Sequence, residues 1–268
     1  MQIVTRFADT ENPRGIVLVA HGYGEHQGRY TFFHDALQRD GYDVAYYDFY
    51  GHGKSGGPRS CVDVGKLIRD HSRARQQVLQ QSRTSHLFLF GHSMGGLISV
   101  ASAILHPQNL SGVVLTGPAL RPLPAVPAEV ARSLLSAARY VPGLPVALTK
   151  RTPESSLLSR NPDVQRAFDA DPLCYHGPVP LLTASTMVVQ GDEVLQRCAH
   201  LSVPTLIFHG TEDRLTAPEA SRQLIDGATA AGNGDAHLRL VDGARHEVLQ
   251  EVEGPGIIRD ILLWLHTH

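Results

Sequence analysis

The sequence has few of the residues that mark metal-binding or disulfide-rich proteins. Its 268 residues include only three cysteines, Cys61, Cys174 and Cys198, which are far apart and form no CxxC pair. Such spacing predicts neither a structural zinc site nor a disulfide framework. The fifteen histidines contain no HExxH motif and no dense cluster with ligand spacing. We therefore expect no metal site.

Long apolar runs and a charge of one sign are missing as well. No uninterrupted apolar segment reaches the roughly 18 to 20 residues of a membrane span. The first residues lack a basic segment followed by an apolar core. With 24 basic and 26 acidic residues the formal charge is −2, so whole-chain charge favours neither nucleic acid nor anionic lipid as a partner. We expect a cytoplasmic protein, with peripheral membrane contact at most.

Short apolar runs recur along the chain, and helical patterns separate them. The composition, 42% hydrophobic and 19% charged, supports one large core. The apolar runs are residues 16–20, 44–47, 87–90, 113–115, 205–208 and 238–241. The helical stretches are residues 30–39, 64–80, 95–105 and 218–225. Because most of the runs are apolar at nearly every position, they predict an α/β fold whose parallel sheet is covered by helices on both faces.

The alternation stops between about residues 118 and 203, where proline is frequent. Apolar residues recur there at near-helical spacing. They are Val130, Leu134, Leu135, Ala138 and Val141. We expect a helical cap, 118–202, inserted into a core domain formed by 1–117 and 203–268. Packing against the core accounts for most of these apolar residues, and the remainder could line a lipophilic pocket.

The strongest chemical signal is the GHSMG motif at residues 91–95. It directly follows an apolar run and directly precedes a helical pattern. A sharp strand-to-helix turn of this kind exposes its central serine, and the flanking glycines avoid collisions with neighbouring backbone. The motif therefore predicts Ser93 as a nucleophile. The alternative is a glycine-rich turn with a capping serine.

A serine nucleophile needs a base, and the base needs a carboxylate to orient it. In this fold the chain order is serine, acid, histidine. Glu212 and Asp213 follow one predicted strand, and His246 lies on the loop after the last strand. We expect His246 to be the base, because its competitors lie inside or beside strands. These competitors are His209 and His237. Position alone leaves both carboxylates open as the acid.

The oxyanion that develops during acyl transfer needs two N–H donors. One should be the backbone amide of Met94, the residue after the nucleophile. The other should come from the loop after the first predicted strand, where glycines keep the chain compact enough to turn the Tyr23 amide inward. His21, in the same loop, is expected to brace it by hydrogen bonding.

In these segments the sequence resembles the monoacylglycerol lipase family, which has bacterial and animal members and is related to lysophospholipases. GxSxG is generic to the superfamily, but HGxGEH together with GHSMGG is much narrower. The matching segments are HGYGEH at 21–26 with Arg29 and Tyr30, GHGKS at 51–55, GHSMGG at 91–96, and HGTEDR at 209–214. Residues 141–145 and 171–177 look like the cap of the bacterial members.

This resemblance implies an α/β-hydrolase fold, no cofactor, and hydrolysis of monoacylglycerols to glycerol and fatty acid through an acyl-enzyme. A general carboxylesterase or lysophospholipase is the alternative, and a non-catalytic ligand-binding hydrolase fold is a third reading. The implied partners are a small lipid substrate and, through the cap, a transiently contacted membrane surface, but no nucleic acid.

The resemblance also assigns roles to residues. It selects Asp213 over Glu212 as the acid, because the family pattern places its aspartate there. Glu25 and Arg29 match positions that lie near the glycerol head group. The implied triad is Ser93, Asp213 and His246. The implied oxyanion donors are the backbone amides of Tyr23 and Met94.

Overall fold

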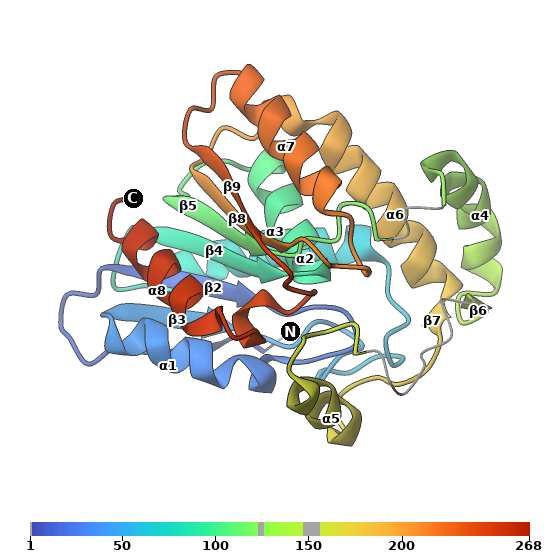
Figure 1. Cartoon of the computed structure of the whole chain (residues 1–268), viewed down its shortest axis with the longest axis horizontal. Helices are drawn as coiled ribbons and strands as arrows, with labels where there is room; N and C mark the ends of the chain where they lie inside the picture. The colour runs from blue at the N-terminus through green and yellow to red at the C-terminus, as the bar shows by residue number, and fades with distance from the viewer. Residues whose placement is uncertain (1, 123–125, 147–155) are drawn as a thin grey trace.

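The computed structural model describes residues 2–122, 126–146 and 156–268. Strands of the main sheet lie in the order β1-β3-β2-β4-β5-β8-β9 (Figure 1). They are β1 (Val4–Arg6), β2 (Gly15–Ala20), β3 (Tyr42–Tyr46), β4 (Leu87–His92), β5 (Gly112–Thr116), β8 (Thr205–Gly210) and β9 (Ala236–Val241). Neighbouring strands are parallel, apart from β1, which is antiparallel to β3. The predicted, mostly parallel sheet is confirmed.

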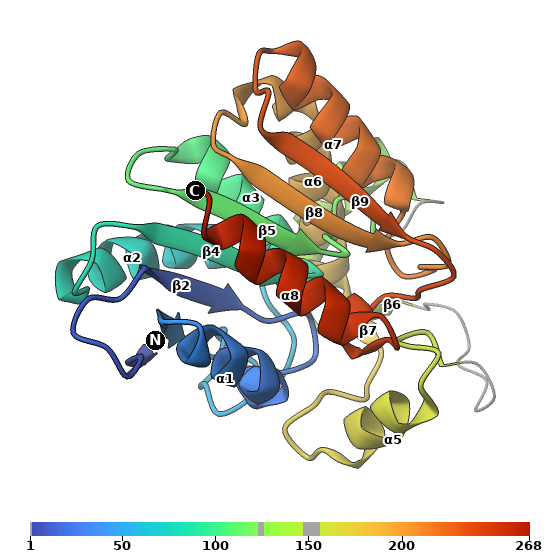
Figure 2. The ribbon, with the colours of Figure 1, turned by 60° about the vertical axis from the view of Figure 1, so that its left-hand side comes forward.

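Helices cover both faces of this sheet, as the sequence predicts. On one face lie α1 (Thr31–Arg39) and α8 (Gly254–Leu265), and Figure 2 shows α8 in front of the sheet, sloping in the same direction as β8 and β9. On the other face lie α2 (Val64–Gln81), α3 (Met94–Leu105), α6 (Leu181–Gln196) and α7 (Pro218–Ala230). Successive strand residues enter opposite cores: Leu89 packs with α3, and Phe90 packs with α1. Two buried faces explain why the strands are apolar throughout.

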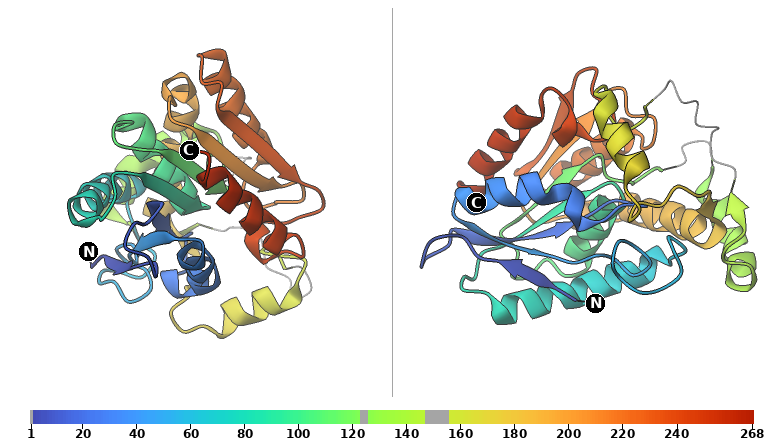
Figure 3. Two further views of the ribbon diagram at one scale, coloured as in Figure 1. Left: turned by 90° about the vertical axis from the view of Figure 1, so that its left-hand side faces the viewer. Right: turned by 90° about the horizontal axis from the view of Figure 1, so that it is seen from below.

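Between β5 and β8 the chain leaves the sheet. The segment contains α4 (Ala128–Tyr140), α5 (Pro162–Ala170), a ribbon of β6 (Pro145–Val146) with β7 (Val179–Pro180), and then α6. Figure 3 shows α4 and α5 beyond one end of the sheet. Helix α6 packs against α4 and also contributes to the main core. Its core residues are Met187, Val194 and Leu195. The insertion is thus joined to the sheet by α6, and its limits as a cap remain a prediction.

The apolar residues of α4 do not all face inward. Ala131 and Ala138 are buried, whereas Val130 and Leu134 are exposed. The predicted helix is therefore present, but part of its apolar stripe faces away from the core. None of the helices among the described residues is long and apolar enough to cross a membrane.

Candidate active site

Ser93 lies at the turn between β4 and α3. Its φ of 53° is in the left-handed region, where a serine is strained. A Cβ on Gly91 would stand 2.4 Å from the Gly95 carbonyl oxygen, and one on Gly95 would stand 2.3 Å from the Ala20 carbonyl oxygen. Only glycine fits at either position. The Ser93 N–H donates to the Thr116 carbonyl of β5 at 3.0 Å, which fixes the turn against the sheet.

His246 follows β9 and Asp213 follows β8, at the same end of the sheet. The Nδ1 atom of His246 lies 2.7 Å from Oδ2 of Asp213, and both side chains are buried. Gly117 makes room for this pair: with φ of 47°, its Cβ would lie 3.2 Å from His246 Nδ1. Because Nδ1 donates to the carboxylate, Nε2 can accept a proton. His246 and Ser93 line one cavity.

The backbone after β8 selects which carboxylate meets the base. Oδ1 of Asp213 accepts the N–H groups of Leu215 at 2.8 Å and Thr216 at 3.0 Å. Its Oδ2 accepts the Thr216 hydroxyl at 2.8 Å. The neighbouring Glu212 side chain is 59% exposed, and its nearest cation is Arg214 at 3.9 Å. The structure therefore brings Asp213, and not Glu212, to His246. The competitor His237 is exposed on β9.

Electrostatics couple the acid and the base. Burial alone would raise the pKa of Asp213, but the attraction of His246 and hydrogen bonds hold that pKa well below its usual range. Burial would likewise lower the pKa of His246, yet the attraction and hydrogen bond of Asp213, together with Glu247 and Glu25, outweigh burial and raise it above 6.5. His92, with its ring 4.7 Å from that of His246, has its pKa lowered to about 3 by burial and by His246. His246 is therefore protonated more readily than the neighbouring His92.

The loop after β2 passes over the nucleophile. A Cβ on Gly22 would lie 3.2 Å from the Ser93 Cβ. Within residues 2–122, 126–146 and 156–268, the Tyr23 N–H donates to no protein acceptor. Met94 is the first residue of α3, where an N–H has no intrahelical partner. Both amides predicted as oxyanion donors are thus unengaged beside the serine.

His21 lies in a bracing position within this loop. Its Nε2 accepts the Phe49 N–H at 3.0 Å, so the ring proton is assigned to Nδ1, which donates to the Gly22 carbonyl at 2.7 Å. Burial lowers the pKa of His21. Both ring nitrogens are occupied by the backbone, and none is left for proton transfer.

Glu25 and Arg29 belong to a second buried cluster, whose third charged member, Glu247, was not predicted from the sequence. The Arg29 guanidinium donates to Glu25 at 2.5 Å and, through two nitrogens, to Glu247 at 2.9 Å each. Glu25 also accepts the Gly22 N–H at 2.5 Å and the Tyr30 hydroxyl at 2.6 Å. Glu247 directly follows His246 in the chain, and this adjacency is the sequence feature that could have indicated its place at the site. The cluster ties the loop after β2 to the loop that carries His246.

Two carboxylates in this cluster share one cation. Burial would raise the pKa of Glu25, but Arg29, His92, His21 and the Tyr30 hydroxyl together outweigh burial and lower it to about 2. The pKa of Glu247 is raised, because burial and Glu25 together exceed the effect of Arg29. The pKa of Arg29 itself lies above its ordinary value, since both carboxylates oppose the cost of burial. The guanidinium therefore stays charged.

A cavity of about 400 Å³ opens at Ser93, a size typical of small-molecule sites. Glu25, Arg29 and Glu247 line it together with the base. The apolar wall comes largely from the insertion. It includes Val146, Leu158, Phe168, Val179, Ala184 and Met187. The cavity thus has a charged part and an apolar part, both in reach of one serine.

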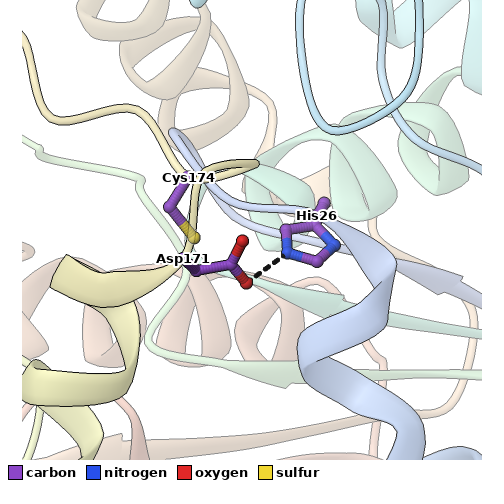
Figure 4. A group of neighbouring side chains, drawn as sticks. All are labelled: His26, Asp171 and Cys174. Atoms are coloured by element: carbon purple, nitrogen blue, oxygen red, sulfur yellow. Dashed lines mark hydrogen bonds and ion pairs between the residues drawn. The ribbon is translucent and has the colours of Figure 1, made fainter.

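His26, Asp171 and Cys174 lie together where the insertion meets the core (Figure 4). Nδ1 of His26 accepts the Gly28 N–H at 3.1 Å, so the ring proton is assigned to Nε2, 2.8 Å from Asp171 Oδ2. Burial raises the pKa of the Cys174 thiol to about 12. A metal would need a free imidazole lone pair and a thiolate. These residues fit a hydrogen-bonded link between insertion and core better than a metal site.

The sheet with its covering helices, the serine at a strand-to-helix turn and the bonded aspartate–histidine pair on later strand ends define an α/β-hydrolase. A family model described as serine aminopeptidase, S33, matches residues 11–253. The monoacylglycerol lipase of Mycolicibacterium smegmatis is 34% identical over 261 residues, which are 97% of this chain and 90% of that protein. The monoglyceride lipase of Rattus norvegicus is 29% identical over 256 residues, 95% of this chain and 82% of that protein.

Among solved structures, the monoacylglycerol lipase of Paleococcus ferrophilus superposes with a TM-score of 0.85 at 31% identity, over 100% of both chains. The chain therefore belongs to the serine hydrolase family that contains these monoacylglycerol lipases. The predicted relationship and enzyme class, a carboxylic ester hydrolase, are confirmed.

Proposed function

We propose that this enzyme cleaves the ester bond of monoacylglycerols, with Ser93 as nucleophile, His246 as general base and Asp213 as the acid that orients it. The observation that carries the proposal is the buried bond between His246 and Asp213 at the cavity that holds the strained serine. The serine oxygen attacks the ester carbonyl carbon while Nε2 of His246 takes the serine proton. The imidazolium that forms is stabilised by the ionised carboxylate.

The tetrahedral intermediate carries its negative charge on the former carbonyl oxygen, and the amides of Tyr23 and Met94 support it. His246 then gives its proton to the glycerol oxygen as the carbon–oxygen bond breaks. Glycerol leaves, and the fatty acyl group remains as an ester on Ser93. A water molecule, deprotonated by His246, attacks this ester. The bond between the acyl carbon and the Ser93 oxygen breaks, His246 returns the proton to that oxygen, and the fatty acid is released.

The two parts of the cavity support a substrate with one acyl chain. Each CH₂ buried against the apolar wall contributes roughly 0.8 kcal/mol, so a single long chain is held well. We place the glycerol beside Glu25 and Arg29, with Glu247 as a third polar neighbour. A second acyl chain there would leave buried charged groups facing hydrocarbon, and an unsatisfied buried polar group costs about 1 to 3 kcal/mol. Residues 118–202 would act as the cap that supplies the apolar wall.

A common assay tests this substrate class. Mono-, di- and trioleoylglycerol, a lysophospholipid and short-chain p-nitrophenyl esters would be compared by kcat/KM in one detergent, with Ser93→Ala as a blank. We expect monooleoylglycerol to exceed the di- and triacylglycerols by about tenfold to a hundredfold. Equal values for all three would contradict the proposal and indicate a broad carboxylesterase. A preference for the lysophospholipid would instead identify lysophospholipids as the substrate class.

We also propose that the insertion touches lipid surfaces while the enzyme remains cytoplasmic. Large apolar side chains are exposed on and after α4, and one of them, on Tyr140, is 87% exposed. They are Val130, Leu134, Tyr140, Val141 and Leu144. Grouped exposed apolar residues favour interfacial contact. Flotation with phosphatidylcholine vesicles should show weak binding that Leu134→Ser and Tyr140→Ser reduce. Leu263→Ser, which changes an exposed leucine on α8, is the matched control and should leave flotation unchanged.

A further inference from the structure

A second buried histidine contacts the proposed catalytic acid. His209 is near the end of β8, and its Nε2 lies 3.2 Å from Oδ2 of Asp213; both side chains are fully buried. Its Nδ1 lies 2.8 Å from the hydroxyl of Ser221 on α7. A chain of polar contacts therefore continues past the acid, from Asp213 through His209 to a helix of the core.

The partners of His209 assign its protons. Nε2 faces two acceptors, Oδ2 of Asp213 and the Thr216 carbonyl at 3.3 Å. The Thr216 hydroxyl is nearby at 3.2 Å, but it donates its own proton to Asp213. Nε2 therefore carries a proton in either charge state of the ring. Ser221 can donate to Nδ1, so both nitrogens are satisfied when the ring is neutral.

We propose that His209 is a positioning residue, which together with Ser221 holds Asp213 in the orientation that His246 requires. Three donors converge on one carboxylate oxygen: the base, the Thr216 hydroxyl and His209. Oδ1 is held by two backbone N–H groups, so the carboxylate cannot rotate without breaking several bonds. His209 also draws negative charge from the oxygen that the base shares. The inference rests on the proposed function, in which Asp213 orients His246.

The chain contains a matched control for this role. His71 on α2 is also fully buried, and its Nδ1 lies 3.0 Å from the hydroxyl of Ser102 on α3. The pair has the same composition as His209 with Ser221, but the pKa of His71 is lowered by burial and by Arg75, with no carboxylate acting on it. Replacing His71 changes a buried histidine without touching the acid. It therefore separates a packing defect from a loss of positioning.

The first test is steady-state kinetics on a p-nitrophenyl ester. His209→Leu removes the donor, and His209→Gln places an amide N–H near the position of Nε2. We expect His209→Leu to lower kcat about tenfold or more with little change in KM, because a hydrogen bond to a charged group is lost away from the substrate. His209→Gln should recover most of the loss, and His71→Leu should keep the native kcat. Where His209→Leu does not fold, Ser221→Ala and His209→Gln supply the comparison.

The second test is an NMR titration of the His246 ring, which needs no turnover. Without the His209 donor, more negative charge remains on Oδ2, so the pKa of His246 should rise in His209→Leu and stay native in His71→Leu. The other groups that face His246 are unchanged by these variants. They are Glu25, His92 and Glu247.

The outcomes separate the two proposals. A native titration together with a native kcat in His209→Leu would overturn the role of His209, as would an equal loss of kcat in His71→Leu. If the native chain hydrolyses no ester, the proposed function fails, whereas a raised His246 pKa in His209→Leu would still support positioning of the Asp213–His246 pair.

Discussion

Two buried acidic clusters meet at one cavity, and they differ in the cation that each carboxylate faces. Asp213 faces His246, whose charge changes near neutral pH. Glu25 and Glu247 face Arg29, whose guanidinium stays charged at every working pH. In the mechanism that we propose, the first cluster exchanges a proton during each turnover. The second is built around a guanidinium that stays charged and, through the Gly22 N–H bound to Glu25, holds the loop after β2 in place.

The largest effect should come from the residue that the first cluster activates. Ser93→Ala removes the nucleophile, and losing a member of such a unit typically costs on the order of 10⁶ in kcat. The substitution touches neither cluster, so thermal unfolding should match that of the native protein. Near-native ester turnover in this variant would mean that the Asp213–His246 cluster does not act through Ser93, and the proposed difference between the two clusters would fail.

Asp213→Asn should produce the next largest loss. The amide cannot stabilise the imidazolium and favours the wrong tautomer, which in trypsin costs about 10⁴ in kcat. Glu212→Gln changes the adjacent, exposed carboxylate and should be close to native. The two variants would be compared by kcat at a fixed alkaline pH. A larger loss in Glu212→Gln would reassign the acid.

Breaking the second cluster should lower the free energy of unfolding more than it changes the chemical step. Arg29→Met leaves Glu25 and Glu247 buried without a cation, and removing one partner from a buried ion pair costs about 3 to 5 kcal/mol. Arg73→Met breaks the exposed pair with Asp70, where the expected loss is about 0 to 1 kcal/mol. Denaturant unfolding of both variants measures the difference. Equal losses would mean that the second cluster is not a structural support.

The smallest expected effect is a shift in pH dependence. Only neutral His246 can accept the serine proton, so kcat/KM should rise with pH. Asp213 raises the pKa of His246, against the opposing effect of burial, so the midpoint should lie above the ordinary value of about 6.5. A pH profile from 5 to 9 on a soluble ester, under conditions where chemistry limits the rate, gives the midpoint. A midpoint below 6.5 would mean that burial outweighs the carboxylate.

Local features of the site could be predicted from sequence, and contacts between distant segments could not. The turn at Ser93 needs only a strand, two glycines and a helix in succession, and the structure has them where the motif places them. The choice between Glu212 and Asp213 was open on position alone, because it depends on backbone N–H groups after β8. The pairing of Arg29 with Glu247 joins residues 218 positions apart, and no local pattern encodes it.

Helix α6 has a further consequence for how this scaffold can change. Because it supplies side chains to the core of the sheet, it cannot be replaced without opening that core. The part of the insertion between β5 and α6 carries most of the apolar cavity wall and contributes little to the sheet's core. Exchange of that part would retain the strands and α6, but it would have to keep Gly117, which makes room for the His246–Asp213 pair, and the Leu158 carbonyl, which accepts the Glu247 N–H at 2.7 Å. Variation confined to the rest of that part would reshape the apolar cavity wall while the strands and α6 stay in place.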